Sequence, residues 1–363
     1  MNKASIAVLG AVLGLASACG DDGTGDETGA STGGDSGSTT QAPATDDGTT
    51  SGSSGEPGTS GGSTSTGTPD DSTGSTSEGE TDTAGFDCDA LAPGPLAVEE
   101  VFPPGAPFNG SEDIAFDGQG NVAGKSGGNV VLVAADGSMV DGWPDPGPAW
   151  GMRFTAAGEL LAAKYQIGEI HVVNDGGAVL VNGLAAVNGL FPDFDGNLWF
   201  TDGGAVRRRN ADGSIDPIVT GTDAMGSNGV VWDPDRGLLF YTRYGAAEVR
   251  SVVIGGDGSP GANSLVADIG GPGTAVDGLS MDACGNLYAV DQANAALYRV
   301  YMDETGSAVG DPELLVASFP SNVANAVFGT GDGWDPLSVY AAGVPGGVYR
   351  VEIGVPGAPY PTP

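Results

Sequence analysis

Short stretches in which apolar and polar residues alternate follow one another from residue 86 to the end of the chain, separated by glycines. One phrase recurs: a polar residue, Gly, two apolar residues around a variable one, Asp, a Gly-Asn turn and an apolar stretch. The turn glycines of five copies are Gly120, Gly158, Gly196, Gly237 and Gly285, so the period is 38 to 48 residues. A sixth, weaker copy starts at Asn325. Each copy indicates a β-hairpin.

A second turn, later in most copies, indicates the size of the repeating unit. It is an Asp-Gly pair at residues 136–137, 175–176, 212–213 and 257–258. Two hairpins per period make a four-stranded sheet, which is the blade of a β-propeller. Helical periodicity is absent from the pattern. The sequence therefore predicts an all-β fold, a six-bladed β-propeller over residues 86–363.

The first 85 residues predict an export signal and a tether. Residues 1–19 combine one early charge, Lys3, with an apolar run too short to span a bilayer. The run ends in Leu15-Ala16-Ser17-Ala18-Cys19, which resembles a bacterial lipobox with Cys19 as the lipidated residue; Ala16-Ser17-Ala18 also fits an ordinary cleavage site. Residues 20–85 are nearly all small or acidic, a composition typical of a disordered linker. We expect an exported protein, lipid-anchored to a bacterial membrane in the periplasm or at the cell surface.

Charge and composition exclude several classes of protein. The chain has 47 acidic and 12 basic residues, a formal net charge of −35, so we expect no nucleic-acid partner. One histidine excludes mechanisms that need a histidine pair, and three cysteines are too few for a thiolate zinc site. With Cys19 assigned to the lipid, Cys88 and Cys284 form an even pair that favours a disulfide in an oxidising setting. Their spacing does not show whether they meet.

The residues that open the repeated phrase predict a site in the propeller channel. In five copies they lie eight or nine positions before the turn glycine, and the first strand of each blade lines the channel. They should form one set, which we call the channel ring: Glu112, Trp150, Asn188, Asn228, Asp277 and Asn325. Carboxylate and amide oxygens that converge on one point suit a hard divalent cation such as calcium or magnesium. A polar lining for a water-filled channel, without metal, is an equally open interpretation.

These phrases resemble those of the senescence marker protein, gluconolactonase and luciferin-regenerating enzyme family of six-bladed propellers. The family's opening phrase is similar to Glu112-Asp113-Ile114. Its Asn-Gly phrase before a Trp-containing strand is similar to residues 227–232, and its Asp-Gly phrase before Gly-Asn-Leu to residues 276–279. The resemblance extends over most of residues 110–352.

The resemblance implies a metal-dependent hydrolase of the lactonase type. The family's three protein metal ligands would map onto Glu112, Asn228 and Asp277, with calcium as the expected cation and zinc or magnesium as alternatives. The cation would polarise a lactone carbonyl, and Asp277 would take the proton of the attacking water. Asn188 would bind the substrate. Apart from the resemblance, Trp150 has two interpretations: its place in the repeat indicates blade packing, and its place in the channel ring indicates the floor of the ligand pocket.

One departure from the family pattern concerns specificity. The sugar-lactone members place an Arg shortly before the substrate-binding Asn, whereas Ala185, Ala186 and Val187 precede Asn188. Arg153 would be a substitute only if it faced the channel, and its spacing favours a blade face instead.

Two alternatives to the enzyme remain open. A non-catalytic propeller lipoprotein would bind a ligand or a protein partner through its loops and would tolerate Ala at each predicted metal ligand. A propeller that holds calcium only for structure would bind metal without turnover. In the enzyme interpretation the partner is a small-molecule substrate. We expect a monomer whose only membrane contact is the lipid anchor.

Overall fold

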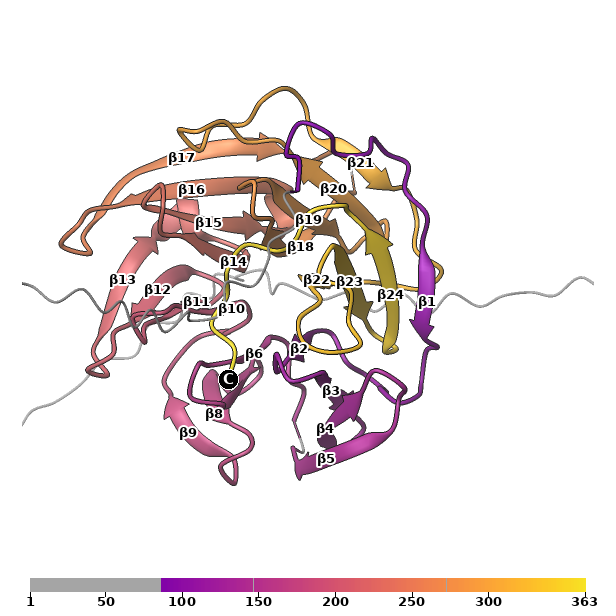
Figure 1. Ribbon diagram of the computed structural model, residues 1–363. Helices are drawn as coiled ribbons and strands as arrows, with labels where there is room; N and C mark the ends of the chain where they lie inside the picture. The colour runs from indigo at the N-terminus through magenta and orange to yellow at the C-terminus, as the bar shows by residue number, and fades with distance from the viewer. Residues whose placement is uncertain (1–85, 146, 272) are drawn as a thin grey trace, which may run out of the picture. The chain divides into compact units, whose positions relative to one another are not determined.

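Six four-stranded antiparallel sheets surround a central channel (Figure 1). The structure is a computed structural model of the 363-residue chain and describes residues 86–145, 147–271 and 273–363. The predicted export signal (1–19), the lipidation site Cys19 and the tether (20–85) lie outside the described residues and stay predictions. Within the described part, no helix is long and apolar enough to cross a membrane. The predicted all-β six-bladed propeller is confirmed.

Each of the first five blades is a consecutive run of strands, ordered from the channel outwards. Blade 1 contains β2 (Ile114–Phe116), β3 (Asn121–Ser126), β4 (Asn129–Ala134) and β5 (Met139–Pro144). Blade 2 contains β6 (Met152–Phe154), β7 (Leu160–Lys164), β8 (Glu169–Val172) and β9 (Ala178–Val181). Blade 3 contains β10 (Leu190–Pro192), β11 (Leu198–Thr201), β12 (Ala205–Arg209) and β13 (Ile215–Thr220), followed by the short 3₁₀ helix η1 (Gly221–Ala224).

Blade 4 contains β14 (Ser227–Asp233), β15 (Leu238–Arg243), β16 (Glu248–Ile254) and β17 (Pro260–Asp268), with η2 (Tyr244–Ala246) between β15 and β16. Blade 5 contains β18 (Val276–Met281), β19 (Leu287–Asp291), β20 (Ala296–Val300) and β21 (Glu313–Val316). Every predicted Asp-Gly turn lies between the third and fourth strands of its blade.

Blade 6 closes the ring with strands from both ends of the described chain. It contains β22 (Asn325–Phe328), β23 (Ser338–Gly343) and β24 (Gly347–Glu352), and β1 (Glu99–Phe102) is its outermost strand. β1 pairs with β24 through Glu99 opposite Arg350 and Glu100 opposite Tyr349. The propeller is therefore closed by backbone hydrogen bonds rather than by a loop.

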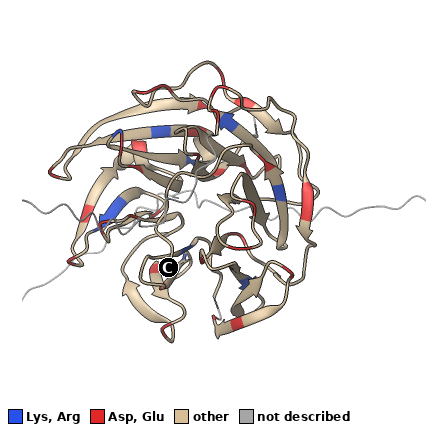
Figure 2. Ribbon diagram, viewed as in Figure 1, with Lys and Arg blue, Asp and Glu red and all other residues tan. Residues whose placement is uncertain are grey.

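Six buried apolar clusters hold the blades together, one between each pair of neighbours. Successive side chains of a strand point to opposite faces, and here both faces are covered by another blade. On β7, for example, Leu160 packs into the cluster shared with blade 1 and Leu161 into the cluster shared with blade 3. Charged residues occur mainly in loops and along outer strands (Figure 2). This packing explains why the apolar stretches are short and recur once per strand.

The Asp and Gly-Asn residues of the repeated phrase form the turn between the first two strands of a blade. Asp117 Oδ1 accepts hydrogen bonds from Gln119 N at 2.8 Å and Asn121 N at 3.0 Å, and Asn121 Nδ2 donates to Asp117 Oδ2 at 2.7 Å. Gly120 has a φ of 95°, which only glycine adopts without strain. The same arrangement recurs at residues 193–197 and 282–286. The repeated Asp residues are therefore turn caps.

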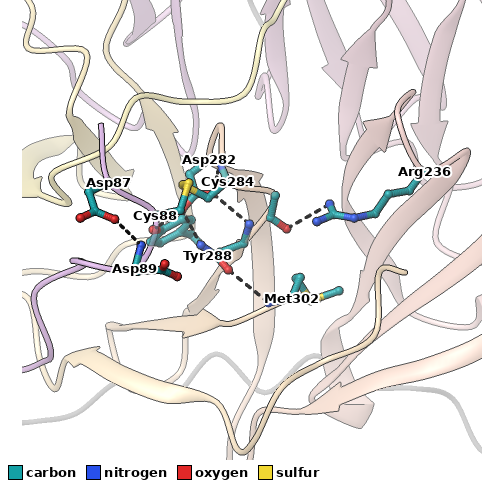
Figure 3. Close-up of a disulfide and its surroundings, with 10 residues drawn as sticks. Asp87, Cys88, Asp89, Arg236, Asp282, Cys284, Tyr288 and Met302 are labelled. Atoms are coloured by element: carbon teal, nitrogen blue, oxygen red, sulfur yellow. Dashed lines mark hydrogen bonds between the residues drawn. A yellow bond between two sulfur atoms is a disulfide. The ribbon is translucent and has the colours of Figure 1, made fainter. Parts of the chain in front are cut away.

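A disulfide bond ties the first described segment to blade 5. Cys88 and Cys284 are bonded, with their Cα atoms 5.7 Å apart. Cys284 lies in the turn between β18 and β19, where its backbone N donates to Asp282 Oδ1 at 2.9 Å. The Tyr288 hydroxyl donates to Asp282 Oδ2 at 2.8 Å (Figure 3). The disulfide is therefore attached to a turn that these two hydrogen bonds hold in place.

Replacing both cysteines, Cys88→Ser together with Cys284→Ser, should destabilise the propeller without changing its fold. The bond joins residues 196 positions apart, and loss of a native disulfide typically costs about 2–5 kcal/mol because the unfolded chain gains freedom. We expect a lower guanidinium midpoint and an unchanged far-UV circular dichroism spectrum. Reductant should produce the same shift in the wild type. Equal midpoints for variant and wild type would show that the bond does not stabilise the fold.

Candidate functional site

A bulge at the start of the inner strand positions the ring residues of blades 4 and 5. Pairing of β14 with β15 passes from Ser227 opposite Arg243 to Val230 opposite Tyr241, so one extra residue is inserted at Asn228-Gly229. Pairing of β18 with β19 passes from Val276 opposite Asp291 to Leu279 opposite Ala289, which inserts one at Asp277-Gly278. Such bulges redirect a side chain out of the sheet, here towards the channel.

The glycine in each of these pairs lets neighbouring inner strands approach closely. A Cβ atom at Gly229 would lie 2.6 Å from Leu279 N and 2.7 Å from Asp277 O. A Cβ at Gly189 would overlap the carbonyl of Asn228, and one at Gly278 would overlap the side chain of Asn325. In these three blades the second position of the repeated phrase therefore requires glycine for space, whereas blades 1 and 6 have Asp113 and Ala326 there.

Two threonines that sequence reasoning missed connect the start of one inner strand to the bulge of the next blade. The Thr201 hydroxyl accepts from Gly189 N at 2.9 Å and donates to Asn228 O at 2.5 Å. The Thr242 hydroxyl accepts from Gly229 N at 2.8 Å and donates to Asp277 O at 2.6 Å. They fix the backbones of two ring residues. Each threonine follows two aromatic residues at or near the end of the second strand of its blade. This shared sequence pattern could have identified both threonines.

Three oxygen-bearing ring residues from blades 1, 4 and 5 lie close enough to influence one another. Glu112, Asn228 and Asp277 are 8%, 9% and 4% exposed. Burial, followed by the negative charges of Asp277 and Asp113, raises the pKa of Glu112 to about 9. Burial, followed by the charge of Asp113, raises the pKa of Asp277 to about 8, and a hydrogen bond with the Asn228 side chain opposes this rise. Both acids are therefore largely protonated near pH 7 in the metal-free protein.

This group fits a hard divalent cation. All its donor atoms are oxygens, and a cation would favour the charged form of both acids. Among the described residues, no group of three or more His, Cys, Asp and Glu side chains is placed to hold a metal ion. The candidate centre therefore needs the Asn228 amide as its third ligand. The neighbouring Asp113 is engaged elsewhere, because its carboxylate accepts from Ile114 N, Met152 N and Arg153 Nη1.

The other three ring residues have different surroundings. Asn188 is 6% exposed, and its backbone N donates to Thr201 O at 3.0 Å. Trp150 is half-buried and stacks on Tyr165, with ring centroids 4.2 Å apart and planes at 9°. Asn325 Oδ1 accepts from Ala326 N at 3.0 Å, which turns this side chain onto its own backbone. Asn188 and Trp150 thus remain candidates for substrate contact.

Tyr244 and Gln292, which have no sequence signal, lie beside the acids. Burial and then the charges of Asp277, Glu112 and Asp291 raise the pKa of the Tyr244 hydroxyl. This hydroxyl donates to Gln292 Oε1 at 2.6 Å, linking η2 of blade 4 to the β19–β20 loop of blade 5. Tyr244 is 37% exposed. The pair therefore forms part of the solvent-facing border of the site.

The expectation that Arg153 points into a blade face is wrong. Arg153 lines a cavity in the channel together with inner-strand residues of the other blades. Its Nη1 donates to Asp113 Oδ2 and to Met152 O, both at 2.6 Å. The prediction counted the alternation of side chains from Trp150. The short β6 strand starts only at Met152, so Trp150 lies outside it and does not fix the direction of the Arg153 side chain. Its ion pair with Asp113 leaves little free positive charge for a substrate.

Comparison with known proteins shows which solved structures share the fold of this chain. No protein-family model and no curated protein matches the chain. Solved structures of similar shape include a gluconolactonase from Xanthomonas campestris (19% identity, 74% of this chain and 96% of that chain, TM-score 0.57). A luciferin-regenerating enzyme also matches (16% identity, 74% of this chain and 99% of that chain, TM-score 0.58). So does the calcium-binding protein regucalcin from Agrobacterium tumefaciens (15% identity, 74% of this chain and 97% of that chain, TM-score 0.58). The six-bladed fold expected from the sequence resemblance is therefore confirmed.

Asp277→Asn should make the metal-free protein more stable at alkaline pH. The folded pKa values of about 8 for Asp277 and about 9 for Glu112 lie above the ordinary values. Stability from the protonated acids is therefore full below about pH 4 and is lost as pH rises through 8 and 9. Asn cannot ionise, so the variant does not lose the stability that the wild type loses when Asp277 ionises. With a chelator present, we expect its thermal midpoint to exceed that of the wild type by a few degrees at pH 9 and hardly at all at pH 5.

The matched control is Asp311→Asn, an exposed acid of blade 5. Its midpoint should follow the wild type at every pH. If the thermal midpoint of Asp277→Asn changed with pH in parallel with that of the wild type, the conclusion that burial and neighbouring negative charge raise the pKa of Asp277 would be wrong.

Proposed function

We propose that this propeller is a divalent-cation-dependent hydrolase of lactones or related esters, with calcium held by Glu112, Asn228 and Asp277. The observation that supports this most is the convergence of two buried acids and an amide from three blades, in surroundings that disfavour the charged acids. The fold is also that of a gluconolactonase and of a calcium-binding regucalcin.

Each channel residue has a definite task in this proposal. When bound there, the cation supplies Lewis acidity that polarises the scissile carbonyl. Asp277 accepts the proton of the attacking water, and Thr242 holds the Asp277 backbone in place through its 2.6 Å hydrogen bond. The Asn188 amide hydrogen-bonds the substrate, and the face of Trp150 that is not stacked on Tyr165 packs against the substrate ring.

A neutral lactone is the substrate class that suits the charges of the site. Ala185, Ala186 and Val187 precede Asn188, so no arginine stands at that place. Arg153 is paired with Asp113. The two acids would neutralise bound calcium, and no free cationic side chain remains to balance the charge of an anionic substrate.

The test is calcium binding and lactone hydrolysis by the full chain and two variants, Asp277→Ala and Glu112→Gln. We expect one calcium ion per wild-type chain by isothermal titration, and an affinity at least about 100-fold lower in each variant because a direct ligand is lost. Hydrolysis of δ-valerolactone and γ-butyrolactone, followed by acid release, should depend on calcium and fall to the buffer rate in both variants.

Glu304→Gln provides the matched control, because Glu304 is exposed and lies outside the channel ring. It should bind calcium and turn over as the wild type does. Calcium binding without hydrolysis of any lactone or ester would favour a structural cation. Absence of calcium, magnesium and zinc binding would contradict the proposal and favour a non-catalytic binding module.

A further inference from the structure

A second, apolar chamber lies in the same channel beyond the ring. It has a volume of about 220 Å³. Each blade contributes an apolar inner-strand side chain to its wall: Ile114, Phe154, Phe191, Val231, Leu279 and Phe328. These residues follow the ring residues of their own blades by two to four positions. No ring residue lines the chamber, so it is separate from the candidate metal centre.

The C-terminal segment supplies another part of the wall, from Pro356 to Tyr360. After β24 the chain returns across the centre of the blades and ends near β6 (Figure 1). Ala283 N donates to Pro356 O and Ala358 N donates to Met281 O, each at 2.9 Å, which ties the segment to blade 5. The Tyr360 hydroxyl donates to Phe154 O at 2.9 Å, and its ring meets Phe191 edge to face at 5.4 Å. The segment is therefore attached on several sides of the chamber.

Three residues of the chamber wall carry hydrogen-bond donors that have no acceptor among the described residues. The Ser280 hydroxyl is buried in a residue 7% exposed, and within the described chain it has no hydrogen-bond partner. The Thr330 hydroxyl, also buried and also on the wall, has none among the same residues. The hydrogen bonds that Arg153 makes to described residues all leave Nη1, so Nε and Nη2 are available. Buried donors without partners cost free energy. A ligand acceptor would remove that cost once the covered Ser280 and Thr330 hydroxyls rotate about χ1 towards the chamber.

The charges around the chamber select an uncharged ligand. The Arg153 guanidinium is already neutralised by Asp113 at 2.6 Å. A carboxylate in the chamber would add negative charge near Asp113 without a free cation, and an organic cation would meet donors instead of acceptors. An apolar cavity of about 150 Å³ holds benzene, so about 220 Å³ has room for one ring with a short polar substituent.

We infer that this chamber is a second ligand site for a small, uncharged, mainly apolar molecule, whose carbonyl oxygen accepts hydrogen bonds from Ser280, Thr330 and Arg153. The inference does not depend on the proposed hydrolase activity, because the two sites share no residue. Its ligand belongs to the class of monocyclic ketones, esters and lactones.

Three probes of similar size separate the interactions: acetophenone, ethylbenzene and benzoate, titrated into the full chain by ligand-observed NMR. Acetophenone should bind with a Kd of roughly a millimolar or tighter. Ethylbenzene lacks the acceptor and benzoate carries a charge, so both should bind at least about threefold more weakly. Absence of acetophenone binding, or benzoate binding as tightly as acetophenone, would overturn the inference.

Four variants test whether acetophenone binds in this chamber. Ser280→Ala removes one donor and should weaken acetophenone binding about three- to tenfold, whereas the exposed Ser307→Ala should leave it unchanged. Val327→Phe fills the chamber and should abolish binding. Ser280→Ala removes a single hydroxyl, so its result stands even if Val327→Phe fails to fold. Glu112→Gln should bind acetophenone as the wild type does. Unchanged binding in Ser280→Ala, or loss of binding in Glu112→Gln, contradicts this location.

Discussion

The close approach of consecutive inner strands around the channel is the constraint on which the rest of the structure depends. Gly189, Gly229 and Gly278 each stand where a side chain would overlap the next blade. Hydrogen bonds across the same contacts hold the backbones of Asn228 and Asp277, because the Thr201 and Thr242 hydroxyls donate to their carbonyl oxygens. Closure through β1 and β24 then prevents any blade from moving outwards alone. The site is therefore a consequence of how the blades meet.

This packing carries an electrostatic cost at one end of the channel. Glu112 and Asp277 are held together in a buried position. Burial raises the pKa values of both, followed by the charges of Asp277 and Asp113 for Glu112 and by the charge of Asp113 for Asp277. A structure that only needed a polar lining would favour neutral side chains there. The other end of the channel is apolar, and the ion pair between Asp113 and Arg153 lies at the boundary, since Asp113 acts on the acids and Arg153 lines the chamber. One channel thus offers two chemically different compartments.

The repeat made the fold predictable, and local geometry made parts of the site unpredictable. The phrase from Asp277 to Asp282 encodes a bulge, an inner strand and a capped turn, so its recurrence predicted both the blades and the ring. Tyr244 and the C-terminal segment belong to no repeat, and only tertiary packing brings them to the channel. Arg153 was misplaced because alternation was counted from Trp150, which lies before β6 rather than in it. Periodicity specifies strands well and irregular segments poorly.

We propose that Glu112, Asn228 and Asp277 form one cation site. The most direct measurement is anomalous diffraction from crystals of the protein soaked in manganese(II), which replaces calcium or magnesium at oxygen sites. We expect a dominant peak in the channel at about 2.1–2.6 Å from side-chain oxygens of all three residues, and no such peak in Asp277→Ala crystals. A channel without a peak, or peaks confined to the acidic turns on the surface, would contradict this proposal.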